Sequence, residues 1–117
     1  MEVDTELPIV SKTYALYKTF SQFRTLVAKQ YKHTICEKVE EYILEILEKL
    51  LETNGLARIE KLPRLEEASV KLNVLRIFIR LMKDTGAIDT KKYTILQTHI
   101  DEIGRMLGGW IKSTQEK

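Results

Sequence analysis

The stretch KHTICEKVEEYILEILEKLLETNG, residues 32–55, decides the fold class. Its apolar residues recur every three or four positions, which places them on one face of an α-helix and fits no strand. Thr34 followed by Glu37 is a capping-box pattern, and Asn54-Gly55 is typical of a left-handed helix stop. The sequence therefore predicts an amphipathic helix over 34–54. Its apolar stripe consists of Ile35, Val39, Tyr42, Ile43, Ile46 and Leu50.

Three further apolar stripes with helical spacing flank this segment. They predict helices over 9–31, 63–84 and 90–114. Pro8 can open the first because the first turn needs no N–H at that point, Pro63 marks the latest start of the next, and Asp89 or Thr90 caps the last. The stripes are Val10, Tyr14, Tyr17, Phe20, Phe23 and Val27; Leu65, Ala68, Leu72, Leu75, Ile79 and Met82; and Tyr93, Leu96, Ile100, Ile103, Leu107 and Trp110.

Four amphipathic helices with short connections predict an all-α fold, an up-down-up-down antiparallel four-helix bundle formed by one domain over 1–117. The chain has 117 residues, of which 44% are hydrophobic and 31% charged, an ordinary balance for one globular domain. It contains no apolar run long enough to cross a membrane and no basic-then-apolar leader, so we expect a cytoplasmic protein without a membrane contact. A single cysteine and two distant histidines predict no metal site and no cofactor.

The formal charge of +2 conceals a strong segregation of charge. Residues 7–34 carry five basic side chains and no acid, and residues 37–52 carry six glutamates against two lysines. Residues 58–92 carry nine basic side chains against five acidic ones. Chains of this kind present surfaces of opposite sign despite a near-neutral total.

The cations are candidate phosphate ligands. Arg76, Arg80 and Lys83 are spaced four and three apart on one line of the third helix, and Arg105 adds a cation on the fourth. A solvated face is the commoner fate of such a charge run, but arginine makes bidentate contacts that lysine cannot. Phosphate binding and ion pairing with the glutamate-rich helix are equally compatible with the pattern. The first helix adds Lys12, Lys18 and Arg24 to the candidates.

Two glycines lower the helix propensity of the segment predicted as the fourth helix. Gly104 and Gly108 share a face, and each costs about 1 kcal/mol relative to alanine inside a helix. Two explanations remain open: a neighbouring helix of the same bundle crosses closely there, or the groove receives a helix from another copy or a partner. Trp110 belongs to the same packed region.

The third helix is apolar nearly all the way round, because Val74, Ile77, Phe78 and Leu81 lie outside its core stripe. A helix of this kind has a second buried face, and no helix is central in a four-helix bundle. The pattern therefore predicts an oligomer in which the third or fourth helix uses its second face between subunits.

No pattern points to an enzyme. The glycines lie inside a helix rather than after a strand, and no nucleophile, base and orienting group can be named. Adjacent acids such as Glu40-Glu41 diverge by about 100° on a helix and do not converge on a metal. We therefore expect no catalytic residue.

Three stretches carry a family resemblance: KHTICEKVEEYILEILEKLLETNG, LNVLRIFIRLMKDTGAIDTKKY and IDEIGRMLGGWIKS, the last at residues 100–113. Their order resembles the Avd-like four-helix-bundle family, which is named for the accessory variability determinant of diversity-generating retroelements and is related to bacterial 23S rRNA intervening-sequence proteins. The resemblance runs from about Tyr14 to Lys112. Its most specific parts are Leu75-Arg76 with Arg80, and Ile103-Gly104-Arg105 with Leu107-Gly108 and Trp110-Ile111.

The resemblance implies a cytoplasmic, non-enzymatic bundle that assembles as a pentameric barrel. Such a protein binds the retroelement's reverse transcriptase and contacts its template-repeat RNA through a basic surface, supporting mutagenic retrohoming. By position, the resemblance places Arg76, Arg80 and Arg105 at the basic surface or subunit contact and Gly104, Gly108 and Trp110 in helix packing. The alternative is an oligomeric protein–protein scaffold that does not bind nucleic acid.

Overall fold

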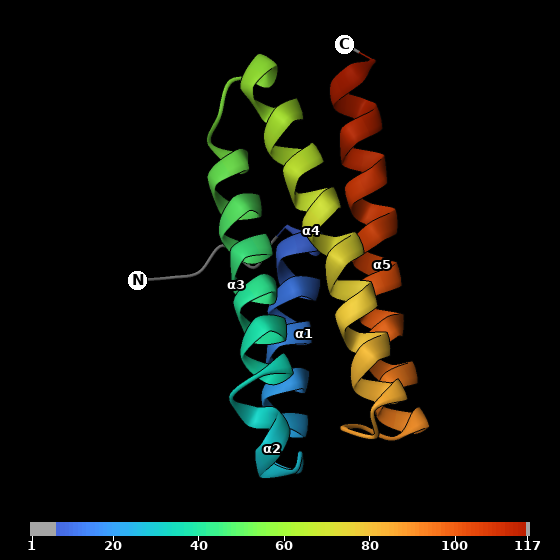
Figure 1. Cartoon of the computed structure of the whole chain (residues 1–117). Coiled ribbons are helices and arrows are strands. Elements are labelled where there is room, and N and C mark those ends of the chain that lie inside the picture. The colour runs from blue at the N-terminus through green and yellow to red at the C-terminus, as the bar shows by residue number, and fades with distance from the viewer. Residues whose placement is uncertain (1–6, 117) are drawn as a thin grey trace.

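The structure is a computed structural model that describes residues 7–116, and these residues form a helical bundle, as predicted (Figure 1). Its helices are α1 (Pro8–Arg24), α2 (Lys29–Lys32), α3 (Ile35–Asn54), α4 (Arg58–Asp84) and α5 (Thr90–Gln115). The four long helices pack in the cyclic order α1, α3, α4, α5, with α1 and α4 on opposite corners. Consequently α5 separates the basic α1 from α4, and the acidic α3 separates them on the other side.

The core is made by the faces that the four long helices turn toward one another. The largest fully buried side chains include Phe20 from α1, Ile43 from α3, Ile79 from α4 and Ile100 from α5. Burial of a large aliphatic or aromatic side chain stabilises a fold by about 1.5–3 kcal/mol. Cys36 is also fully buried, and desolvation raises the pKa of its thiol, so it serves as a small apolar core residue.

The predicted helix over 9–31 is wrong in one respect, because the structure has two helices there. α1 ends at Arg24, and the Leu26 and Val27 amides donate to carbonyls three residues back, which closes the helix with a tight turn. The buried face of α1 also differs from the predicted stripe, because Leu16 is buried and Tyr14 is 40% exposed. Val27 lies in the turn after α1 and is nevertheless buried. Its apolar side chain therefore continues the spacing of the stripe although the helix has ended.

The boundaries predicted for α3 are correct to within one residue, but its caps are not those predicted. The Thr34 hydroxyl donates to the Tyr31 carbonyl at 3.3 Å instead of accepting from an amide of the first turn. Gly55 has a φ of −93°, so the helix stops without a left-handed residue. The left-handed stop occurs instead at the end of α4, where Gly86 has a φ of 84°. There the Ala87 amide donates to the Met82 carbonyl at 2.8 Å, as in a Schellman motif.

The helix predicted over 63–84 corresponds to α4, which begins earlier than predicted, at Arg58 rather than at Pro63. Proline removes one amide from the helix and would leave the Ile59 carbonyl without its usual donor. Ile59 is 86% exposed, so this region of the helix is open to water, which can supply the missing hydrogen bond. The start of α5 is as predicted, because Asp89 caps it by accepting from the Lys92 amide at 2.8 Å.

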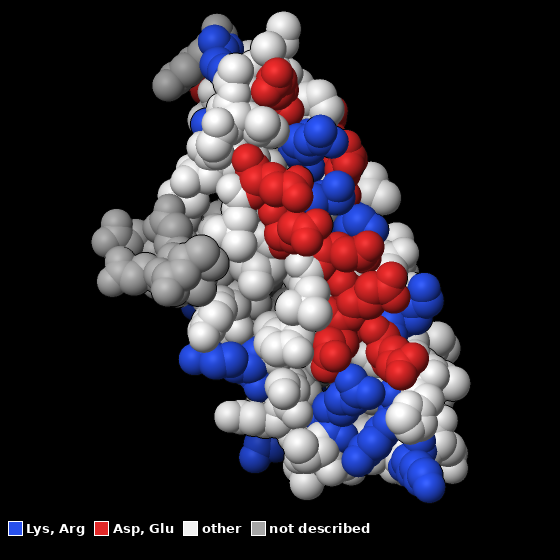
Figure 2. All heavy atoms as spheres, turned by 90° about the vertical axis from the view of Figure 1, so that its left-hand side faces the viewer, with Lys and Arg blue, Asp and Glu red and all other residues white. Residues whose placement is uncertain are grey.

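Figure 2 shows acidic side chains gathered in a band along the α3 side of the bundle, with basic side chains among them and along its edge. The band lies on the α3 side, away from the seam between α4 and α5.

Candidate nucleic-acid interface

Arg76 is fixed at the seam between α4 and α5. Its guanidinium pairs with Asp101, and its backbone carbonyl accepts from Gln97 Nε2 at 3.3 Å. The side chain is one-third exposed, so the pair lies at the rim of the bundle and retains one open side. Of the two roles that the sequence left open for this residue, ion pairing is present, but its partner lies on α5 and not on the glutamate-rich α3.

Gly104 explains why Arg76 can lie so close to α5. A β-carbon at position 104 would lie 2.8 Å from Arg76 Nη2 and 3.7 Å from Leu72 Cδ2. Arg76 and Leu72 line a shallow hollow, together with Asp101, Arg105 and Asn73. Asn73 was not a candidate in the sequence, and only its position one turn before Arg76 could have indicated it.

Two of the other candidate cations on α4 and α5, Arg80 and Arg105, are more open than Arg76. The Arg80 side chain is 68% exposed, and its contact with Asp84 in the next turn is long, at 3.7 Å. Arg105 is exposed, and no acidic partner lies within ion-pair distance among residues 7–116. Lys83 is half-buried, with its ammonium 4.9 Å from the centre of the Tyr93 ring. Among the candidate cations of α4 and α5, Arg80 and Arg105 are thus the most available to a ligand.

The three α1 candidates do not join this group. Arg24 donates to Glu40 Oε2 and to the Lys32 carbonyl, both at 2.9 Å, and so ties the end of α1 to α2 and α3. Lys18 lies 5.0 Å from the centre of the Tyr14 ring. Only Lys12 points toward α5, where it pairs with Glu102 and, through that hydrogen bond, lowers the pKa of the carboxyl group.

The packing candidates also have separate surroundings. Phe78 packs inside the chain against Tyr42, with ring centres 5.2 Å apart and an edge-to-face angle of 71°. Trp110 is half-buried and lines an apolar hollow between α5 and the start of α1, with Met106 and Ile9. Gly108 is exposed, and a β-carbon there would have no neighbouring side chain or other helix within 4 Å in the described part of the chain. Close packing within the chain therefore accounts for Gly104 and not for Gly108.

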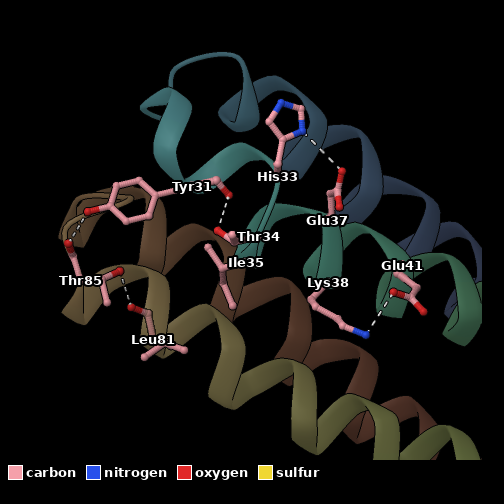
Figure 3. Close-up of a pocket in the computed structure, with 9 residues that line it drawn as sticks. All are labelled: Tyr31, His33, Thr34, Ile35, Glu37, Lys38, Glu41, Leu81 and Thr85. Atoms are coloured by element: carbon pink, nitrogen blue, oxygen red, sulfur yellow. Dashed lines mark hydrogen bonds and ion pairs between the residues drawn. The ribbon is translucent and has the colours of Figure 1, made fainter.

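A larger hollow of about 700 Å³ lies where α2 and α3 meet the end of α4 (Figure 3). Its polar groups are already engaged with one another. Tyr31 donates to the Thr85 carbonyl at 2.9 Å, Thr85 donates to the Leu81 carbonyl at 2.8 Å, and His33 lies 3.5 Å from Glu37. The hollow therefore presents no activated nucleophile, since both of its threonine hydroxyls donate to main-chain carbonyls.

Within residues 7–116 no three His, Cys, Asp or Glu side chains are grouped so that they could hold a metal ion. Over the same residues, every helix lacks either the length or the apolar run that crossing a bilayer requires.

Comparison with known proteins identifies the family. No curated protein matches the chain. The profile of the family described as bAvd-like matches residues 7–114, which covers all of α1 to α4 and nearly all of α5. The chain therefore belongs to the bAvd-like family.

Proposed function

We propose that this protein is a non-catalytic accessory protein of a diversity-generating retroelement. In this role it binds the element's reverse transcriptase and template RNA during mutagenic retrohoming. The observation that carries the proposal is the membership of residues 7–114 in the bAvd-like family. Five copies assemble into a ring, and the protein acts in the cytoplasm.

The arrangement of charge supports RNA binding along the seam between α4 and α5. Arg105 lines the hollow at this seam, Arg80 follows Arg76 by one helical turn on α4, and both are exposed. The six glutamates of α3 lie on the other side of α4. Guanidinium groups bind phosphate in a bidentate manner. The contacts are mainly to backbone phosphates, because aromatic residues such as Phe20 are buried in the core and unavailable for stacking on bases.

Assembly strengthens this surface. One chain carries only +2, but five chains bring +10 into one ring. If the acidic α3 helices point away from the RNA, the surface that faces the RNA is considerably more positive than the total. Oligomerisation thus gives a weakly basic subunit the field that RNA binding requires.

The test is the affinity of the purified protein for a labelled structured RNA at increasing salt, with its mass in solution recorded on the same sample. We expect a ring-sized oligomer whose affinity falls by about 10³-fold or more between low and moderate salt, as for a protein that engages six or more phosphates. An oligomer that does not bind RNA even at low salt would overturn the RNA role and leave the protein–protein scaffold as its function.

A further inference from the structure

The hollow between α4 and α5 has a volume of about 390 Å³ and a largely polar rim. From α4 it is lined by Ser69, Asn73 and Arg76, which are spaced four and three apart and so share one face of the helix. From α5 it is lined by Asp101 and Arg105, which are four apart. The two helices therefore bring hydrogen-bond donors from both sides to one place.

The floor of this hollow is apolar. Leu72 and Leu107 form it, and each is only 2% exposed. Gly104 keeps the space above them open, because a β-carbon there would lie 2.8 Å from Arg76 Nη2 and 3.7 Å from Leu72 Cδ2. Hydrogen bonds to an anion are stronger beside an apolar floor than on an open surface, since the local dielectric constant is lower.

The donors around the hollow are only partly used within the chain. Arg76 gives Nη1 to Asp101, and a guanidinium carries five N–H donors, so the ion pair leaves others available. Among residues 7–116 no hydrogen bond engages the Ser69 hydroxyl or the Asn73 amide, and Arg105 has no ion-pair partner. Four side chains at one hollow can therefore donate to the same anion.

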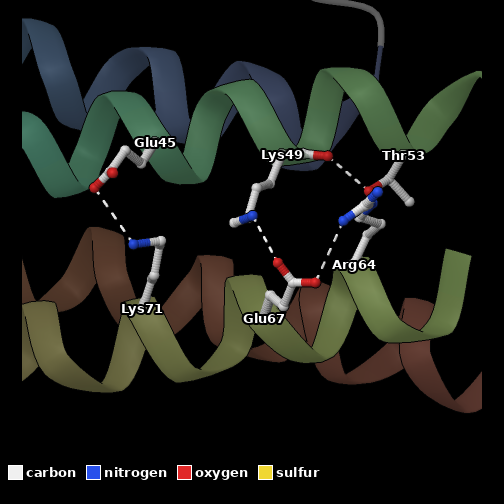
Figure 4. A network of polar contacts seen from close by, with 6 residues as sticks. All are labelled: Glu45, Lys49, Thr53, Arg64, Glu67 and Lys71. Carbon is white, nitrogen blue, oxygen red and sulfur yellow. Dashed lines mark hydrogen bonds and ion pairs between the residues drawn. The ribbon is translucent and has the colours of Figure 1, made fainter.

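The seam on the other side of α4 is already filled by ion pairs. Lys49 lies 2.8 Å from Glu67, which Arg64 also contacts (Figure 4). Lys71 lies 3.4 Å from Glu45 in the same network. Each basic side chain of this network thus faces a carboxylate, whereas one carboxylate faces two guanidinium groups at the α4–α5 hollow. An anion is favoured at the hollow and not at the α3–α4 seam.

We propose that this hollow seats one phosphodiester group of the bound RNA and that Asp101 competes with the phosphate for Arg76. This subsite rests on the proposed function and gives it a defined contact. The phosphate oxygens accept from the two arginines, the Asn73 amide and the Ser69 hydroxyl. Asp101 holds the guanidinium in place in the absence of RNA. Its side chain is 61% exposed, so the carboxylate can turn into water when the phosphate binds Arg76.

The test is the affinity for a labelled structured RNA at one fixed low salt concentration, and its first variant changes no charge. Ser69→Ala/Asn73→Ala should lose about fivefold or more in affinity, because two hydrogen bonds to phosphate are lost. The slope of log affinity against log salt should stay the same, since no cation is removed. Ser21→Ala/Gln22→Ala is the matched control, because it removes two exposed neutral polar side chains from α1. It should bind as the unaltered chain does.

The second variant removes the competing charge. Asp101→Asn keeps a side chain of similar shape beside Arg76 and should raise RNA affinity by about threefold. Glu48→Gln removes an equal charge from the exposed surface of α3 and should raise it less. The gain from Asp101→Asn should disappear when Arg76 is replaced by glutamine, because the competition acts through Arg76. Equal gains in both backgrounds would contradict the competition.

Unchanged RNA affinity in the Ser69/Asn73 variant would overturn the subsite and leave the RNA role intact, whereas an unaltered chain that binds no RNA would overturn both. Inorganic phosphate tests a different occupant. If it raises the melting temperature of the unaltered chain but not of the Ser69/Asn73 variant, and RNA affinity is equal in the two, the hollow binds a free phosphate group and not RNA. Urea unfolding checks that each variant is folded, since the substituted side chains are exposed or half-buried.

Discussion

The guanidinium of Arg76 occupies the space that Gly104 leaves on the neighbouring helix. Its Nη2 atom lies 2.8 Å from the position of a β-carbon at residue 104, while Nη1 reaches Asp101. The glycine thus permits a specific side chain on α4 to cross over α5. The cost of one helical glycine is offset here by an interhelical ion pair, and the effect can be measured.

Gly104→Ala should leave the free energy of unfolding nearly unchanged. Alanine gains about 1 kcal/mol in helix propensity, but the methyl group displaces the guanidinium and weakens its pair with Asp101. At Gly109 the added methyl group would have no contact within 4 Å among the residues that the structure describes, so Gly109→Ala should gain the full amount of about 1 kcal/mol. Urea unfolding measures both. When Arg76 is also replaced by alanine, Gly104→Ala should gain about 1 kcal/mol as well. If Gly104→Ala and Gly109→Ala gain equally while Arg76 is present, the contact between Arg76 and residue 104 is contradicted.

Arg24→Met should destabilise the bundle by about 1–3 kcal/mol, because the side chain donates two charge-assisted hydrogen bonds that tie α1 to α2 and α3. Lys18→Met removes an equal charge from the exposed side of α1 and should cost little. Urea unfolding again separates the two. RNA affinity of the folded Arg24 variant should be unchanged, and a selective loss of RNA binding would assign Arg24 a role at the interface.

Much of the fold could be predicted because its elements follow from local spacing. The stripe and ends of α3 and the Asp89 cap of α5 depend on residues within one or two helical turns. The break after Arg24 could not be predicted, because the buried Val27 continues the apolar spacing through a turn. The start of α4 was predicted too late, at Pro63, because a proline inside a helix is tolerated here where the helix is exposed to water. The six residues before Pro63 form the helix N-cap and its first turns.

The candidate site was less predictable, because ion pairs form between residues far apart in the chain. Arg76 and Asp101 are 25 residues apart, and their pairing depends on the alignment of α4 with α5. The sequence offered the glutamates of α3 as partners for the α4 arginines, yet Arg24 is the arginine that α3 engages. Only the position of each helix in the bundle distinguishes these outcomes.

Acid should weaken the bundle through carboxylates that the fold stabilises in the charged form. The hydrogen bond from Lys12 lowers the pKa of Glu102, and the hydrogen bond from Lys49 lowers that of Glu67. A carboxyl group with a lowered pKa in the folded state stabilises it above the unfolded value of about 4.3 and loses this effect as the pH falls through the folded value.

The melting temperature should therefore fall as the pH is lowered from about 5 to 3. Glu102→Gln should flatten this dependence, and Glu48→Gln, at a position with no ion-pair partner among residues 7–116, serves as the control. An equally steep decline in the Glu102 variant would show that the Lys12 contact is not maintained in solution.

Arg80→Gln/Arg105→Gln should weaken binding of a structured RNA and reduce the slope of log affinity against log salt by about one for each phosphate that is no longer bound. Both side chains are exposed, so stability should change little. Arg64→Gln is the control, because Arg64 is an exposed arginine of α4 that faces the α3 seam and pairs with Glu67. An equal loss of affinity in both variants would indicate a general charge effect without a defined surface.

Gly108→Ala tests where subunits meet. Among residues 7–116 no atom outside the helix itself lies within 4 Å of a β-carbon at this position, so alanine should stabilise the isolated fold by about 1 kcal/mol. In the proposed ring, a neighbouring subunit packs closely against this face of α5, and the added methyl group should lower the mass in solution at a given protein concentration. Gly109→Ala lies about 100° further round the helix and should leave the assembly intact. Sedimentation of both variants decides the matter, because an unchanged assembly in the Gly108 variant would place the subunit contact on another face.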